Sequence, residues 1–159
     1  MLRHGARSPH DFGDSSLNAD GRAQAEALAR AISPQGPLPA PTALASSPKR
    51  RAKETLAPLA AALQLRLTVD QRLDERHQNE TMKEFEARIR ALLDELASGG
   101  RDTCVYLCSH LDWLELALAL LPSDLRDTDV NWTNCEYRVF RWQDDLWSLV
   151  SNGTVKAGG

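Results

Sequence analysis

The sequence is poor in cysteine and has no long apolar run. Its three cysteines, Cys104, Cys108 and Cys135, form no Cys-x-x-Cys pair, and their odd number argues against a disulfide framework, so we expect reduced, buried thiols. The longest apolar region, at 111–121, contains two acidic residues and is shorter than the roughly 18 residues of a membrane span. The N-terminal segment lacks the apolar stretch of a signal peptide. These absences predict a cytoplasmic protein that binds no membrane.

An excess of basic residues is also missing. The chain has 19 Lys and Arg residues against 22 Asp and Glu residues, a formal net charge of −3, which argues against a nucleic-acid partner. No His-Glu-x-x-His or paired-cysteine spacing indicates a metal site, and no cofactor is expected. With 42% hydrophobic and 26% charged residues, the composition is typical of a folded chain. We expect one domain over 1–159, as a monomer or a weak dimer.

Segments with strand and helix patterns alternate along the chain. Strands are predicted at 42–46, 65–69 and 104–108, helices at 24–32, 47–63, 82–98 and 111–121, and a terminal hairpin at 135–142 and 146–150. Asn18 and Ser47 are the predicted N-caps of the first two helices, with Pro48 opening the second and Pro58 kinking or ending it. This order predicts an α/β fold: a three-layer α/β/α sandwich with a mostly parallel sheet and an antiparallel terminal hairpin.

Basic residues and histidines follow three of the predicted strands. Leu2 is followed by Arg3-His4-Gly5-Ala6-Arg7, Ala45 by Ser46-Ser-Pro-Lys-Arg-Arg-Ala52, and Cys108 by Ser109-His110. In open α/β sheets the ligand site lies at the carboxyl ends of the strands, where such residues meet. One guanidinium group can donate two parallel hydrogen bonds to phosphoryl oxygens. A neutral imidazole can attack phosphorus, and a second imidazole can stabilise the charge that develops on the phosphoryl oxygens. The three strand ends therefore predict a phosphoryl-transfer site.

In chain order, these motifs resemble those of the histidine phosphatase superfamily, also called phosphoglycerate-mutase-like. The matching segments are Arg-His-Gly at 3–5, Leu17-Asn-Ala-Asp-Gly21 with Gln24-Ala25, Ser46-Ser-Pro-x-x-Arg-Ala52, and Ser109-His110, and they span nearly the whole chain. The resemblance implies a nucleophilic His4 and a phosphate pocket completed by Arg3, Arg51 and His110. The small size and the short terminal hairpin are most similar to the SixA-type phosphohistidine phosphatases.

Arg7 carries a second, more limited resemblance. Residues 3–9, Arg-His-Gly-Ala-Arg-Ser-Pro, fit the signature of the histidine acid phosphatases, in which the second arginine also binds phosphate. The large helical insertion of those enzymes is absent, and Leu111 separates His110 from Asp112 where they have a His-Asp pair. We therefore expect Arg7 to bind phosphate and place the chain outside that branch. Lys49 and Arg50 are predicted to be charges at the rim of the site.

Three carboxylates are candidates for the proton donor that an ester leaving group needs. Ester-cleaving relatives have a Leu-x-Glu after the third strand, and Leu73-Asp74-Glu75 stands at that place, so Glu75 is the first candidate. Glu80 and Asp112 are the alternatives. SixA-type members commonly lack this acid, because a departing imidazole depends less on proton transfer. The other interpretation of Glu75 is a single charge in a solvated loop over 74–80.

Only Met1 and Leu2 precede the Arg-His-Gly motif, where the family usually has a strand of several apolar residues. We therefore expect a truncated first strand. The corresponding hypothesis is that Met1 is an internal methionine of a longer native chain, or that the start has been misassigned.

The predicted function is that of a metal-independent phosphatase. It would hydrolyse a phosphomonoester or a phosphohistidine protein through a phosphohistidine intermediate on His4. An alternative is a non-catalytic module of the same fold that binds phosphate or a phosphoprotein. A third hypothesis, a structural interaction module, rests on Trp132, Trp142 and Trp147, although tryptophans at strand spacing more often pack within a hairpin.

Overall fold

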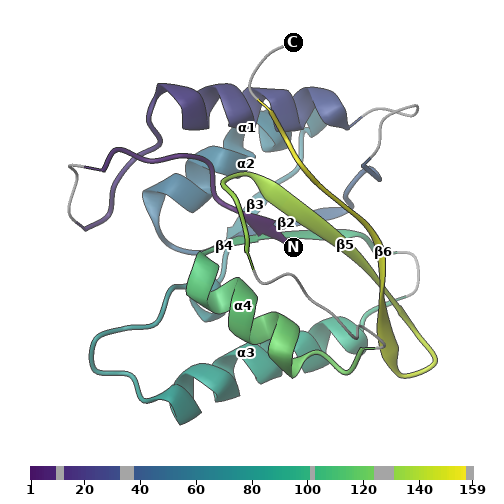
Figure 1. Cartoon of the computed structure of the whole chain (residues 1–159). Coiled ribbons are helices and arrows are strands. Elements are labelled where there is room, and N and C mark those ends of the chain that lie inside the picture. The colour runs from purple at the N-terminus through teal and green to yellow at the C-terminus, as the bar shows by residue number, and fades with distance from the viewer. Residues whose placement is uncertain (10–12, 33–37, 101–102, 124–130, 157–159) are drawn as a thin grey trace.

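The computed structural model describes residues 1–9, 13–32, 38–100, 103–123 and 131–156. Within these residues, six strands form one sheet in the order β3-β2-β4-β1-β5-β6 (Figure 1). The strands are β1 (Leu2–Arg3), β2 (Ala43–Ser46), β3 (Leu67–Val69), β4 (Val105–Ser109), β5 (Glu136–Gln143) and β6 (Leu146–Thr154). The predicted α/β fold is confirmed.

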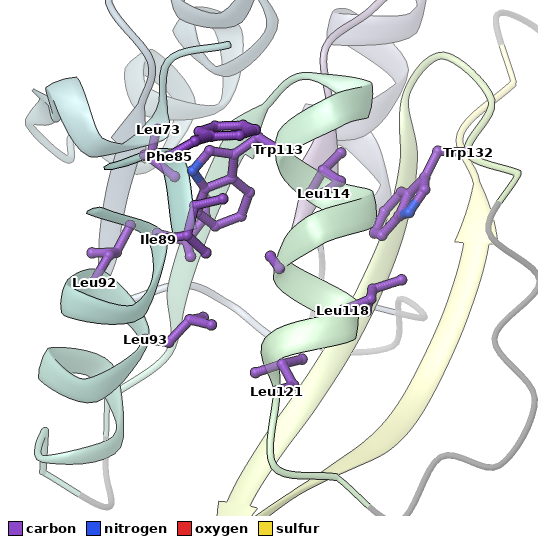
Figure 2. Close-up of a cluster of buried hydrophobic side chains, with 12 residues drawn as sticks. Leu73, Phe85, Ile89, Leu92, Leu93, Trp113, Leu114, Leu118, Leu121 and Trp132 are labelled. Atoms are coloured by element: carbon purple, nitrogen blue, oxygen red, sulfur yellow. The ribbon is translucent and has the colours of Figure 1, made fainter. Parts of the chain in front are cut away.

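Helices cover both faces of this sheet (Figure 1). They are α1 (Ala19–Ala31), α2 (Arg50–Leu63), α3 (Met82–Ala97) and α4 (Leu111–Leu120), with a short 3-10 turn, η1 (Gln71–Leu73). The α3/α4 layer buries an apolar cluster around Trp113, Phe85 and Leu114 (Figure 2). A second apolar cluster, which includes Leu28 and Leu56, lies under α1 and α2. In the part of the chain that the structure describes, no helix is long and apolar enough to span a membrane.

The strand directions bring three strand ends to one edge. β1 and β2 each pair in parallel with β4, whereas β5 runs antiparallel to both β1 and β6. Arg3 lies opposite Ser109, and Ser46 lies opposite Cys108. The backbone continues this register, because His4 N–H donates to the Ser109 carbonyl at 3.1 Å. The residues that follow β1, β2 and β4 are therefore neighbours, as the predicted topology requires.

The strand β1 is much shorter than its neighbours. It has two residues, whereas β4 has five and β5 has eight, in agreement with the expected truncation. A cavity of about 520 Å³ lies beside the amino end of β1, and its lining includes side chains from both apolar clusters, among them Leu28, Leu38, Leu93 and Leu96. The α-amino group of Met1 is buried there and donates to the Arg138 carbonyl at 2.8 Å.

The start of α2 differs from the prediction. The helix begins at Arg50 with Lys49 as N-cap, instead of having Ser47 as N-cap and Pro48 at its first position. The Ser47 hydroxyl is committed elsewhere, because it lies 2.7 Å from His110 Nε2 and accepts the Lys49 N–H at 3.3 Å. Pro58 does not end α2, which continues to Leu63. The Asn18 N-cap of α1 is confirmed by its side-chain bond to the Gly21 N–H.

Candidate active site

His4 directly follows β1 and is almost fully buried. Its Nδ1 lies 2.8 Å from the Gly5 carbonyl, which can only accept, so Nδ1 carries the hydrogen. The lone pair of a neutral ring is then on Nε2, and Arg51 Nε donates to that atom at 3.3 Å. The backbone thus fixes the tautomer that leaves Nε2 free as a nucleophile.

The backbone of Gly5, which holds the His4 ring, is itself anchored to α2. The Gly5 N–H donates to Thr55 Oγ1 at 2.9 Å, and the Thr55 hydroxyl donates to the Arg51 carbonyl at 2.7 Å. A Cβ atom at Gly5 would lie 2.9 Å from the Gly21 carbonyl oxygen, so this close approach requires glycine. His4 is therefore tied through Gly5 to the first turns of α2.

His110 is the N-cap residue of α4 and is buried beside His4. The two ring centroids are 5.2 Å apart. Arg51 Nη2 lies 3.2 Å from His110 Nδ1, and since a guanidinium can only donate, Nδ1 accepts. In the neutral ring, Nε2–H then donates to Ser47 Oγ at 2.7 Å. Arg51 therefore contacts both imidazoles.

Two buried guanidinium nitrogens, one on Arg51 and one on Arg3, have no hydrogen-bond partner among the described residues. Arg51 is only 3% exposed, and its Nη1 has no hydrogen-bond acceptor among the described residues. The same holds for the buried Nε of Arg3, whose Nη1 donates to the Trp132 carbonyl. Buried donors are normally satisfied, and oxygen atoms of a bound anion would satisfy these two. A phosphoryl group fits this donor set.

Both histidines are held neutral near pH 7. Burial, followed by the positive charges of Arg51, Arg3 and Arg7, lowers the pKa of His4 from 6.5 to about 4. The bond between His4 and the Gly5 carbonyl acts in the opposite direction but does not prevail. Burial and then the charge of Arg51 lower the pKa of His110 to about 2. A neutral imidazole with a free lone pair is the form that can attack phosphorus.

Arg7 is more exposed than the other predicted phosphate ligands. Its side chain is exposed, and its Nη1 donates to Ser15 Oγ at 3.4 Å. No contact joins it to either ring within the described residues, although its charge contributes to the lowered pKa of both. Arg7 is thus placed to reach an incoming group from the solvent side.

Only one of the three candidate acids lies at this site. Glu75 Oε2 accepts from Arg51 Nη2 at 2.5 Å, and its side chain is 37% exposed. Glu80 instead accepts two bonds from Arg88, which lower its pKa to about 2. Asp112 accepts the backbone N–H groups of Trp113 and Arg76.

Lys49 is not the simple rim charge that was predicted. Its Nζ lies 3.5 Å from Glu75 Oε1 and 3.8 Å from Asp74 Oδ2, and its side chain is only 26% exposed. Arg50 does lie at the surface, where it pairs with Glu54. The difference arises because Lys49 precedes α2 in an extended conformation and reaches across to the segment after β3.

The structure also adds a residue that the sequence analysis did not select. Asp74 is buried, and its Oδ1 lies 3.8 Å from His110 Nε2. Its Oδ2 accepts from His77 Nε2 at 2.9 Å. A carboxylate in a polar run such as 74–80 gives no sequence signal of burial. Among the described residues, no cluster of His, Cys, Asp or Glu side chains is arranged to bind a metal ion.

Comparison with known proteins gives a family. The model of the histidine phosphatase superfamily (branch 1) matches residues 1–79 and 76–154. No curated protein sequence matches the chain significantly.

Solved structures with similar folds come from several organisms. A mycobacterial glucosyl-3-phosphoglycerate phosphatase has a TM-score of 0.70 at 23% identity, over 100% of this chain and 98% of its own. A phosphoserine phosphatase from Entamoeba histolytica gives 0.76 at 15% identity, over 96% and 94%. A putative alpha-ribazole-5'-P phosphatase from Escherichia coli gives 0.77 at 16% identity, over 99% and 96%. At these identities, the similarity shows a shared fold.

Proposed function

Because the chain belongs to the histidine phosphatase superfamily, we propose that it hydrolyses a phosphomonoester through a phosphohistidine intermediate on His4. The observation that carries this proposal is the orientation of His4. Its Nδ1 is occupied by the Gly5 carbonyl, so Nε2 is the atom available for attack. The unpartnered nitrogen of Arg51, which contacts both imidazoles, could bind a phosphoryl oxygen, and Arg3, whose charge acts on His4, could supply a second donor.

In the first step, His4 Nε2 attacks phosphorus and the bond from phosphorus to the ester oxygen breaks. Glu75 donates a proton to the departing oxygen. Arg3, Arg51 and His110 stabilise the charge on the remaining phosphoryl oxygens, with Arg7 approaching from the solvent side. The charge of the phosphoryl group also favours protonation of His110 next to Arg51, which would make its Nδ1 a donor.

In the second step, water attacks the phosphohistidine. The Glu75 carboxylate takes a proton from that water, the bond between phosphorus and Nε2 breaks, and inorganic phosphate leaves. Glu75 thereby returns to its acid form and His4 to its neutral form. The chemistry requires no metal ion.

The position of Glu75 supports an ester as substrate. An alkoxide is a poor leaving group and needs a proton, whereas a neutral imidazole does not need one to the same degree. A carboxyl group beside Arg51 would therefore be of most use against phosphomonoesters. The folds of the phosphoserine and glucosyl-3-phosphoglycerate phosphatases are consistent with a small phosphorylated molecule as substrate.

The test compares two substrate classes and one substitution. Initial rates would be measured with phosphoserine and with a phosphohistidine peptide, for the wild type and Glu75→Gln, in excess chelator. We expect ester hydrolysis that falls by about 10²-fold or more in Glu75→Gln, the usual contribution of a general acid. Phosphohistidine hydrolysis that ignores the substitution would instead indicate a SixA-like phosphatase. Phosphate binding without turnover of either substrate would indicate the non-catalytic module.

A further inference from the structure

The segment between β2 and α2 reaches the proposed acid through one side chain. Lys49 Nζ lies 3.5 Å from Glu75 Oε1, and Arg51 holds Oε2 on the other side of the same carboxyl group. We propose that Lys49 is a positioning residue that keeps Glu75 over the leaving group. This inference rests on the proposed phosphatase function.

A bound phosphoryl group would compete with Glu75 for Arg51. In the free site, Arg51 donates to Glu75 through Nη2, while its Nη1 has no acceptor among the described residues. A phosphoryl group bound to Arg51 places negative charge beside Glu75 Oε2. Like charges repel, so this arrangement weakens the contact between Arg51 and the Glu75 carboxylate.

Glu75 needs a second partner once its contact with Arg51 weakens. The Glu75 side chain is 37% exposed, so without another partner it can turn towards solvent. Lys49 supplies that partner at Oε1. With Oε1 held by Lys49, Oε2 stays on the side of Arg51, 3.7 Å from His110 Nδ1.

Lys49 is itself held in place by its backbone. Its backbone N–H donates to Ser47 Oγ at 3.3 Å, and its carbonyl accepts from Ala52 and Lys53 in the first turn of α2. The buried carboxylate of Asp74 lies 3.8 Å from Nζ and supplies a counter-charge behind the ammonium group. Lys49 therefore spans a defined gap between the start of α2 and the segment after β3.

The test separates positioning from phosphate binding by the choice of leaving group. Phosphoserine has an alkoxide leaving group that needs a proton, whereas 4-nitrophenyl phosphate releases a stabilised phenolate that does not. The variants are Lys49→Met, which removes the charge, and Lys49→Arg, which restores a donor. The matched control is Lys53→Met, because Lys53 lies in the first turn of α2, next to Lys49, and its side chain forms no ion pair within the described residues.

We expect Lys49→Met to lower kcat for phosphoserine by about tenfold, as part of the general-acid contribution, with KM changed by less than twofold. The kcat for 4-nitrophenyl phosphate should stay within twofold of wild type, Lys49→Arg should recover most of the loss, and Lys53→Met should behave as wild type. Equal losses on both substrates, or a rise in KM alone, would make Lys49 a phosphate ligand and overturn the inference. Unchanged rates would also overturn it. A wild type that turns over neither ester would overturn the proposed function as well.

Discussion

The two ends of β1 present opposite environments within a strand of two residues. At the carboxyl end, His4, His110 and Arg51 form a buried polar network in which the ring nitrogens all have partners. At the amino end, the same strand borders an apolar cavity of about 520 Å³. One end is ordered by directional hydrogen bonds, and the other lacks the close packing that is usual in protein interiors.

The hydrogen bonds that hold the site are gathered at the carboxyl end of β1. The backbone of His4 is held on both sides, by the Ser109 carbonyl and by the N–H of Cys135. Asn134 adds a side-chain bond to the His4 carbonyl at 3.2 Å. These bonds all lie at the carboxyl end. We therefore expect activity to depend on the polar end and stability to reflect the packing around the cavity.

The largest expected effect comes from removing the nucleophile at the polar end. His4→Ala should lower kcat for phosphoserine by at least about 10³-fold, because it removes the imidazole that would form the phosphohistidine intermediate. The fold should persist, which circular dichroism and a thermal melt would check alongside the rates. Residual turnover above a few per cent of wild type would show that another residue attacks phosphorus.

The sequence could predict which residues meet at the polar end but not all of their contacts. The motifs after three strands bring His4, His110 and Arg51 together, because the ends of parallel strands share one edge of a sheet. The side-chain roles of Lys49 and Asp74 depend instead on how two loops approach each other. No pattern in the sequence indicates that these two loops lie close together.

The start of α2 shows the same limit. Ser47 followed by Pro48 is a common helix opening, and local propensity therefore predicted the wrong start. In the structure the Ser47 hydroxyl is hydrogen-bonded to His110 and does not cap α2. This bond between distant residues outweighs the local preference for serine as an N-cap. At the amino end of β1, the two apolar residues before the Arg-His-Gly motif predicted a short strand. The cavity beside it could not be predicted, because it depends on how side chains from distant segments pack together.

A matched pair of leucines would test the contrast in packing. Leu114 is fully buried in the α3/α4 cluster, whereas Leu96 is half-buried and lines the cavity. Leu114→Ala should lower the free energy of unfolding by about 3 kcal/mol, within the usual range for a packed core leucine. Leu96→Ala should cost about 1 kcal/mol, because part of its surface already lacks packing partners. Urea denaturation of both variants gives the comparison, and equal losses would show that the cavity region is as well packed as the core.

A last expected effect is a gradual dependence of stability on pH, which arises mainly at the polar end. The folded protein keeps His4 neutral down to a pKa of about 4, whereas an unfolded histidine takes up a proton near pH 6.5. His110 behaves in the same way, with its pKa lowered to about 2. Between pH 6.5 and 4.5 the unfolded state therefore binds more protons, so the free energy of unfolding must fall as the pH falls.

Each histidine contributes a slope that approaches about 1.4 kcal/mol per pH unit. Glu80 does not add to this window, because its lowered pKa affects stability only below its ordinary value of 4.5. Urea titrations at pH 6.5, 5.5 and 4.5 should show the fall in wild type, and His4→Gln should remove about half of it. At the cavity end, burial lowers the pKa of the Met1 α-amino group to about 6, which adds a smaller contribution of the same sign near pH 6.5. Leu96→Ala leaves all three groups in place, so it should keep the wild-type slope while lowering stability at every pH. An unchanged slope in His4→Gln would mean that the buried imidazole at the end of β1 takes up its proton without unfolding the chain.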